Sequence, residues 1–576
     1  MKKIIALLLA LVMALGLVAC GGQQAVSNEE VEVEKELPRA FASPDWDGSM
    51  PLVAEGEEVT ITLGIQTNAN VIDFDTNEYT LWLEEQTGVN IEFMIFGANS
   101  SDAATQVSLM VAGGEKLPDV FCGVGGINKA TAKEYVRDGY FLDLSEYMTT
   151  NAYYMDSSTR MYYPDDAERE QVVKYLLANA SDPVSKTVIG MPSIYNNPND
   201  CIGTQVWINQ DWLDTLGLTA PTTIDELYDV AVAFRDGDPN GNGKKDEIPL
   251  AGLADSDARS ITQWITNAFL YAYDGYKFSV ENDVVDAIYH KDEYRQALIY
   301  LKKLVDEQLL TPLCWTMSSS EIKALVNPTE DLTLGIFASP GDVTFETNHP
   351  NMDAYVPLAP LADATGIGGW SPKRMDVMSY GTFITADCEN PLIAFRLMDF
   401  MSSPEAYLRG RWGVPGRDWN YVDESNTLPG CLGGEARIEV INPNVLNEVN
   451  NTVWHSGGCG IASEGYWQYT LDTSDDSWKT KLYLGLQEQI ALNNAGKNAE
   501  QVMPIVERTA ETDEAYTEAN ANLTSYVKQA RANFCNGITD PTNDADWNRY
   551  LEDLEGLGYY TDWIGIAQES WNILNG

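Results

Sequence analysis

Residues 59–124 read VTITLGIQTNANVIDFDTNEYTLWLEEQTGVNIEFMIFGANSSDAATQVSLMVAGGEKLPDVFCGV, and they alternate between strand and helix patterns. Three strands and two helices are expected, at 59–65, 90–96 and 119–124 and at 76–86 (Thr76 the cap) and 102–112. This order predicts a parallel sheet with right-handed crossovers, and therefore an α/β fold. In such folds ligands bind at the carboxyl ends of the strands.

The loop after the first expected strand, residues 66–76, lies at that edge and is rich in polar side chains. Asn68, Asn70 and Asp73 offer donors and acceptors of the kind that a hydroxyl-rich ligand needs. The alternative is an Asx-rich turn, since the same residue types form turns by bonding to nearby backbone. Both interpretations remain open at this point.

The amino-terminal residues, MKKIIALLLALVMALGLVAC, combine two lysines, an apolar run and small residues before Cys20. This pattern resembles the signal of bacterial lipoproteins (residues 1–20). The resemblance implies that Cys20 is acylated and becomes the first residue, and two acyl chains give stable membrane attachment. An ordinary secretion signal and an uncleaved membrane anchor are the alternatives. Residues 21–56, small, polar and acidic, are expected to form a flexible tether.

The charge balance limits the possible partners. The chain carries 86 acidic and 36 basic residues, a formal net charge of −50, which excludes nucleic acid as a natural ligand and favours neutral solutes. Eight cysteines without a CxxC pair do not indicate a disulfide framework, and three separated histidines disfavour zinc.

A calcium-binding loop is predicted after a helix that Thr223 and Glu226 begin with a capping box. Oxygen-bearing side chains occupy alternate positions, as the first half of an EF-hand loop requires, and Gly243 permits the sharp turn. The expected ligands of a structural Ca²⁺ are Asp238, Asn240, Asn242, the carbonyl of Lys244, Asp246 and Glu247. Pro249 stands where an EF-hand has its bidentate glutamate, so Glu247 would have to substitute. The alternative is a polar turn without metal.

The stretch that contains this loop, INQDWLDTLGLTAPTTIDELYDVAVAFRDGDPNGNGKKDEIPL (208–250), resembles family 1 extracellular solute-binding lipoproteins. These are the oligosaccharide receptors of ABC importers in Firmicutes. Further segments agree in order along the chain: LPDVFCG (117–123), VIGMP (188–192), CENPLIAFRLMDFMSSPEA (388–406), WGVPGRDW (412–419) and FCNGITDPTNDADWNRYLEDLEGLG (534–558).

The resemblance implies a two-lobe, periplasmic-binding-protein-like (type II) α/β fold with a hinge and a helix-rich carboxyl-terminal region. The expected first lobe comprises 57–204 and 373–410, and the second comprises 205–372 and 411–576. The calcium loop would belong to the second lobe. The resemblance further implies a monomer that is lipid-anchored at the extracellular face of the cytoplasmic membrane and delivers its solute to ABC permease subunits. Solute capture by closure of the two lobes is expected.

Aromatic composition suggests a sugar ligand, because flat rings stack on the apolar faces of sugars. Five tryptophans in loops or at the expected crossing are candidate contacts: Trp207, Trp264, Trp315, Trp370 and Trp454. Most buried tryptophans belong to a core, so this interpretation competes with a structural one. A peptide ligand, a glycan-active hydrolase and a surface adhesin remain alternatives. The chain lacks a GxSxG elbow, a Walker loop and metal-hydrolase spacing, so no enzyme is expected.

Overall fold

The protein is described by a computed structural model. The structure describes residues 36–576 except 196–198, 200–201, 255–258, 274–276, 363–367, 373–376, 424, 426–427, 447, 456–460, 463–468, 499–500, 504–505, 507, 510 and 576. The predicted signal, including Cys20, lies outside the described residues. Within them, no helix is both long and apolar enough to cross a membrane.

A six-stranded sheet forms the centre of the first lobe, in the order β16-β6-β13-β3-β1-β2. Its strands are β1 (Val59–Gln66), β2 (Val89–Phe96), β3 (Val120–Cys122), β6 (Met191–Tyr195), β13 (Val377–Ile384) and β16 (Ile461–Ala462). β1 pairs in parallel with both β2 and β3, which confirms the prediction from 59–124. β13 is antiparallel to β3 and β6.

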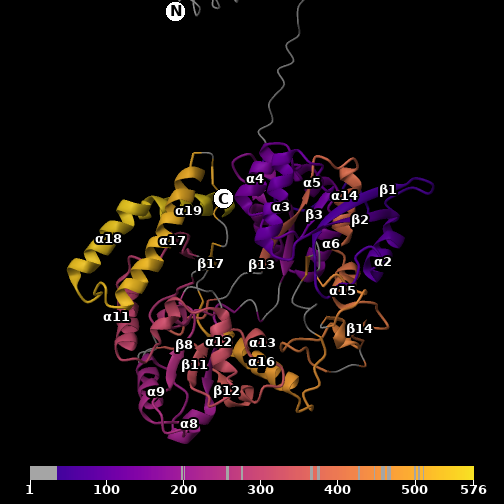
Figure 1. The fold of residues 1–576 in the computed structure, drawn as a ribbon. Helices are drawn as coiled ribbons and strands as arrows, with labels where there is room; N and C mark the ends of the chain where they lie inside the picture. Colours follow the sequence, from indigo (N-terminus) through magenta and orange to yellow (C-terminus); the bar gives the residue numbers. More distant parts are fainter. Residues whose placement is uncertain are drawn as a thin grey trace, which may run out of the picture. The chain divides into compact units, whose positions relative to one another are not determined.

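The helices of the first lobe cover both faces of this sheet (Figure 1). They are α2 (Glu78–Thr87), α3 (Ser100–Gly113), α4 (Lys129–Arg137), α5 (Ser145–Thr150), α6 (Tyr153–Tyr162), α7 (Asp166–Asn179) and α14 (Pro391–Phe400). α2 begins one residue later than expected, because Asn77 rather than Thr76 caps it by accepting from Tyr79 N. Gly88, at φ 71°, ends the helix in the left-handed conformation that favours glycine.

The second lobe contains a four-stranded sheet in the order β12-β7-β11-β8. Its strands are β7 (Val206–Asn209), β8 (Ile248–Ala251), β11 (Leu334–Ala338) and β12 (Tyr355–Pro357). β8 and β11 are parallel, so their carboxyl ends share one edge. A separate three-stranded sheet has the order β10-β9-β17, formed by β9 (Ser279–Glu281), β10 (Val284–Asp286) and β17 (Gln501–Val502).

The carboxyl-terminal helices share a hydrophobic core with the second lobe. Buried residues of α17 (Asp513–Cys535), α18 (Asp544–Gly558) and α19 (Tyr560–Asn575) pack with those of β7, β8 and β11. The other helices of this lobe are α8 (Gln210–Leu216), α9 (Ile224–Asp236), α10 (Ile261–Thr266), α11 (Asp292–Asp306), α12 (Ser319–Val326), α13 (Gly341–Thr344) and α16 (Trp478–Ala495). Large aromatic side chains such as Trp563 fill this core and exclude water from it.

The chain after residue 411 is divided between the two lobes, whereas the prediction assigned all of 411–576 to the second lobe. α15 (Pro404–Trp412) leads into the pair β14 (Trp419–Tyr421) and β15 (Ile438–Val440), whose buried residues pack against β7 and β11. The chain then returns: Trp454 is buried in the first-lobe core, and β16 adds to the edge of the first sheet. Sheet-edge pairing is made by backbone groups, so the amino-acid pattern gave little sign of it.

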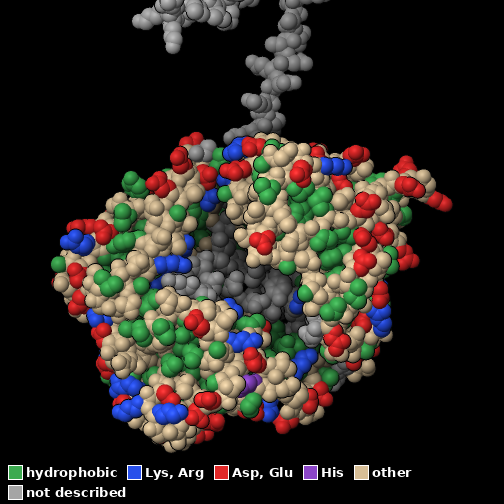
Figure 2. All heavy atoms as spheres, in the orientation of Figure 1, with side chains coloured by type: hydrophobic (Ala, Val, Ile, Leu, Met, Phe, Trp, Pro, Cys, Tyr) green, Lys and Arg blue, Asp and Glu red, His purple; other side chains and the backbone are tan. Residues whose placement is uncertain are grey.

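Acidic side chains are scattered over the face drawn in Figure 2, among hydrophobic and uncharged ones. They do not gather in one patch there. This distribution suits the role in solubility that a net charge of −50 suggests.

Candidate functional site

A cavity of about 620 Å³ opens in the second lobe beside the three-stranded sheet. It is bounded by the chain after α10, the β9–β10 hairpin, the start of α11 and the loop that carries Trp370. The lining residues are Phe269, Leu270, Tyr271, Ser279, Glu281, Asn282, Val284, Asp286, Lys291, Glu293, Gly368, Trp370 and Lys497. Of the eight ligand contacts predicted from the sequence, Trp370 is the one that lines this cavity.

Trp370 is a half-buried indole packed against a small apolar cluster. Tyr271 meets it edge-on, with ring centroids 5.9 Å apart at 86°. The ammonium group of Lys497 lies 6.0 Å from the centre of the indole ring. This arrangement presents an aromatic surface with charged groups around it.

The backbone on both sides of Trp370 is tied down. Its amide donates to Asn267 O at 3.2 Å, and the amide of Ser371 donates to Lys497 O at 2.6 Å. Gly368 precedes it at φ 94°, where a Cβ would lie 2.2 Å from Ala268 O. Only glycine fits that close approach. The indole is therefore held in one position before any ligand arrives, which lowers the entropy cost of binding.

Trp207 positions a loop. It is 2 % exposed, and its Nε1 donates to Ser339 O at 3.1 Å, behind the loop that follows β11. Gln205 holds the same loop by accepting from Gly341 N at 3.3 Å. The segment leads into α13, where desolvation raises the pKa of Asp342. This burial gives the predicted ligand contact at Trp207 no support, and the contact stays a prediction.

The other three candidate tryptophans lie in or against hydrophobic cores. Trp264 is 4 % exposed within α10, and Trp315 is partly buried against the same core. Trp454 is 1 % exposed, meets Tyr79 edge-on at 5.0 Å and donates to Thr80 Oγ1 at 2.9 Å. These side chains stabilise the two lobes, so the structure gives their predicted ligand contacts no support.

The loop after β1 forms Asx turns and pairs with a distant segment. Asn68 Oδ1 accepts from Asn70 N at 2.9 Å, and Asp73 Oδ1 accepts from Asp75 N at 3.0 Å. The loop backbone also exchanges hydrogen bonds with Asn450. The geometry matches the turn interpretation, and the ligand role of these residues stays a prediction.

Gln66 organises the carboxyl edge of the first sheet, and sequence reasoning missed it. Its Nε2 donates to Gly97 O at 2.9 Å, and its Oε1 accepts from Gly125 N at 2.9 Å. One side chain therefore joins the loops that follow β1, β2 and β3. The available signal was its position at the carboxyl end of the first expected strand, where ligands bind in such folds.

The predicted calcium loop turns sharply and brings its oxygen-bearing side chains together. Asp238, at φ 49°, accepts from Gly243 N through both carboxylate oxygens, at 3.2 and 3.1 Å. Asn242 Nδ2 donates to the two oxygens of Asp246 at 3.2 and 3.3 Å, and Asn240 Nδ2 reaches Asp246 at 3.4 Å. Two of the side chains expected to ligate a cation, Asn240 and Asn242, thus meet a third, Asp246.

The donor set of this loop fits a hard cation. The asparagine oxygens accept from backbone amides, Asn240 Oδ1 from Asn242 N at 3.1 Å and Asn242 Oδ1 from Lys244 N at 2.8 Å, so each amide would have to turn to present its oxygen to a cation. Glu247 Oε1 is shielded from solvent and has no hydrogen-bond partner among the described residues, as expected of a ligand that awaits a cation. Across the described part of the chain, no three His, Cys, Asp or Glu side chains gather at one point, so asparagine and carbonyl oxygens would complete the set.

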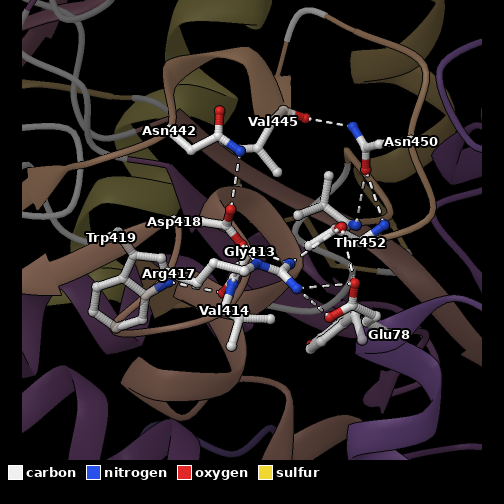
Figure 3. Close-up of polar contacts among 12 residues, drawn as sticks. Glu78, Gly413, Val414, Arg417, Asp418, Trp419, Asn442, Val445, Asn450 and Thr452 are labelled. Atoms are coloured by element: carbon white, nitrogen blue, oxygen red, sulfur yellow. Dashed lines mark hydrogen bonds and ion pairs between the residues drawn. The ribbon is translucent and has the colours of Figure 1, made fainter.

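Arg417 joins the chain after α15 to helix α2 of the first lobe (Figure 3). Its guanidinium donates to Glu78 Oε2 at 2.9 Å and to Asp418 Oδ2 at 2.8 Å. Burial of Asp418 acts to raise its pKa, but hydrogen bonds from Arg417 and Asn442 outweigh this and hold the pKa below its ordinary value. Thr452 also donates to Glu78, at 3.3 Å. This polar junction serves the architecture and lies apart from the residues that line the cavity.

Two α/β lobes, each with its own sheet and core, and a preformed aromatic cavity define a ligand-binding protein of the two-lobe class. The model of the family described as bacterial extracellular solute-binding protein matches residues 75–407. The chain belongs to that family.

Two relatives illustrate the similarity. The fructooligosaccharide ABC transporter substrate-binding protein FusA of Streptococcus pneumoniae serotype 4 is 23 % identical over 507 residues, covering 85 % of this chain and 86 % of FusA. Lipoprotein LipO of Bacillus subtilis is 24 % identical over 423 residues, covering 69 % of this chain and 76 % of LipO.

Solved structures share the fold. An HMO-binding solute-binding protein from Bifidobacterium longum infantis superposes with a TM-score of 0.68 at 19 % identity, over 90 % of this chain and 99 % of that one. An EF-hand mutant of FusA in complex with fructo-nystose superposes with a TM-score of 0.66 at 19 % identity, over 89 % of this chain and 99 % of that one. The two-lobe fold expected from the sequence is thereby confirmed.

Proposed function

We propose that this protein captures an oligosaccharide outside the cell and delivers it to the permease of an ABC importer. The Trp370 cavity is the observation that carries the proposal. A rigid indole can stack on a sugar ring, while Glu281, Asp286 and Asn282 provide acceptors and donors for hydroxyl groups. The named sugar ligands of FusA and of the Bifidobacterium protein support the same ligand class.

Two further features complete the proposal. The loop from Asp238 to Glu247 holds a structural Ca²⁺, which the converging oxygens and the orphaned Glu247 Oε1 support, as does the EF-hand named in a relative. Cys20 attaches the protein to the extracellular face of the membrane through lipid. The lipoprotein name of LipO is consistent with that attachment. Relatives are substrate-binding components, so no enzymatic step is assigned.

The closure expected from the sequence suits such a receptor. Sugar would first bind the Trp370 surface of the open form, and contacts made only on closing would then shift the population toward the closed form. A micromolar ligand needs a total of only about −8 kcal/mol, which one stacked ring and several hydrogen bonds can provide.

Calorimetric titration tests the site, with a chain that begins after Cys20 and a panel of oligosaccharides, peptides serving as controls. Trp370→Ala should weaken binding of the best glycan by tenfold or more, since a truncated aromatic anchor costs about 2 kcal/mol. Tyr421→Ala, which removes an exposed ring far from the cavity, should leave affinity unchanged.

Three results would contradict the proposal. Unchanged affinity in Trp370→Ala would move the site elsewhere, and binding of peptides alone would change the ligand class. Cleavage of a bound glycan during incubation would replace transport with hydrolysis.

A further inference from the structure

The cavity that Trp370 lines contains more negatively than positively charged groups. Its lining includes three carboxylates and two ammonium groups. Lys291 Nζ lies 2.8 Å from Asp286 Oδ2, so these two charges largely compensate one another. Lys497 lies beside the indole of Trp370.

Glu281 and Glu293 are the two remaining carboxylates. Both are exposed, and neither forms an ion pair with any residue that the structure describes. They come from different elements, the β9–β10 hairpin and the first turn of α11. With three carboxylates against two ammonium groups, the cavity lining carries an excess of negative charge, in a chain of net charge −50.

We infer that this cavity favours uncharged glycans over uronic-acid glycans, with Glu281 and Glu293 as the residues that determine the difference. The inference rests on the proposed function, because it names the glycan class of the same site. Carboxylates accept strong hydrogen bonds from sugar hydroxyls, so they favour a neutral glycan. A uronate brings one more negative charge per sugar unit to the same place and is repelled.

The size of the effect follows from solvent exposure. Because both carboxylates are hydrated, each repulsion should change affinity by only about threefold at low salt. The changes multiply when several uronates lie in the cavity, and they shrink as salt shortens the range of the interaction. If Lys497 governed recognition instead, its positive charge would favour an anionic glycan. The acidic glycans would then bind more tightly than the neutral ones.

The experiment compares two panels by calorimetry at 20 and 300 mM salt. One contains neutral fructo-, gluco-, galacto- and manno-oligosaccharides, and the other contains galacturonate and mannuronate oligosaccharides of equal length. We expect the neutral panel to bind more tightly than the acidic panel, by about three- to tenfold at 20 mM salt. An acidic glycan that binds as tightly as the best neutral one would overturn the inference and leave the proposed function intact. Absence of binding from both panels would defeat both.

The variant Glu281→Gln/Glu293→Gln assigns the selection to these residues. In competition with the best neutral glycan, the acidic glycans should have an inhibition constant about three- to tenfold lower for this variant than for the unmodified protein at 20 mM salt. The improvement should be smaller at 300 mM. Glu92→Gln removes an exposed charge from β2 in the first lobe and is the matched control. Equal inhibition constants in the double variant and the control would show that other groups make the selection.

Discussion

Asp399 illustrates at the scale of a residue how burial changes a common side chain. It is 0 % exposed, and its two carboxylate oxygens accept from Tyr154 N at 2.7 Å and from Met155 N at 2.9 Å, at the start of α6. Desolvation raises its pKa to about 7 despite these hydrogen bonds. The group is therefore protonated in the folded protein at pH values where the unfolded chain has already ionised it.

This difference predicts a pH dependence of stability. Between about pH 4 and pH 7 the folded protein retains a proton that the unfolded chain has lost, so the free energy of unfolding falls as pH rises. The slope contributed by Asp399 is at most about 1.4 kcal/mol per pH unit, and the contribution levels off above pH 7. Urea unfolding of the unmodified protein and Asp399→Asn across this range measures it.

Asp399→Asn should lose about 1–3 kcal/mol, because an amide cannot accept both backbone hydrogen bonds, and its curve should lack this slope. Asp75→Asn, an exposed control, should retain the slope. Parallel curves for Asp399→Asn and the unmodified protein would show that Asp399 does not titrate in this range.

At the scale of elements, short sequence patterns predicted the structure correctly where contacts between residues close in the sequence determine it. The parallel pairing of β1 with β2 and β3 and the end of α2 at Gly88 followed from spacing alone. Thr223 caps α9 by accepting from Glu226 N, as predicted, but the Glu226 carboxylate accepts from Thr222 instead of returning to Thr223. Neighbouring hydroxyls compete for one carboxylate, and sequence spacing does not decide between them.

The calcium loop carries the prediction at this scale. A cation bound only to the folded loop raises stability by about 2.7 kcal/mol when its concentration is one hundred times Kd. Chelator should therefore lower the melting temperature of the unmodified protein. Asp246→Ala should melt at a lower temperature, show no response to chelator and keep nearly the same glycan affinity.

Asp331→Ala is the control for the calcium loop, because Asp331 lies 3.9 Å from Lys244 Nζ and is not among the proposed ligands. It should respond to chelator as the unmodified protein does. Identical melting curves of the unmodified protein with and without chelator would contradict the calcium proposal.

At the scale of the whole molecule, the proposed lipid anchor would set where the protein works. Two acyl chains on Cys20 hold a protein at a membrane stably, whereas none leaves it free in the medium. We expect Cys20→Ala to move from the membrane fraction to the medium, or to remain as uncleaved precursor, measured by detergent-phase partition and mass spectrometry. Unchanged partition of a correctly cleaved Cys20→Ala chain would contradict the lipoprotein prediction.

By itself the sequence determined the family and the parallel order of the first strands, and it supplied the oxygen-bearing side chains of the predicted calcium loop. These depend on periodicity and spacing within a few tens of residues. Only the tertiary structure decided which of the candidate tryptophans lines a cavity. Trp454 is enclosed by Phe74 and Tyr79 from almost four hundred residues earlier, whereas Trp370 borders a cavity. Burial is set by elements that meet through folding, so side chains of the same kind in similar loops became part of a core in one case and the lining of a cavity in the other.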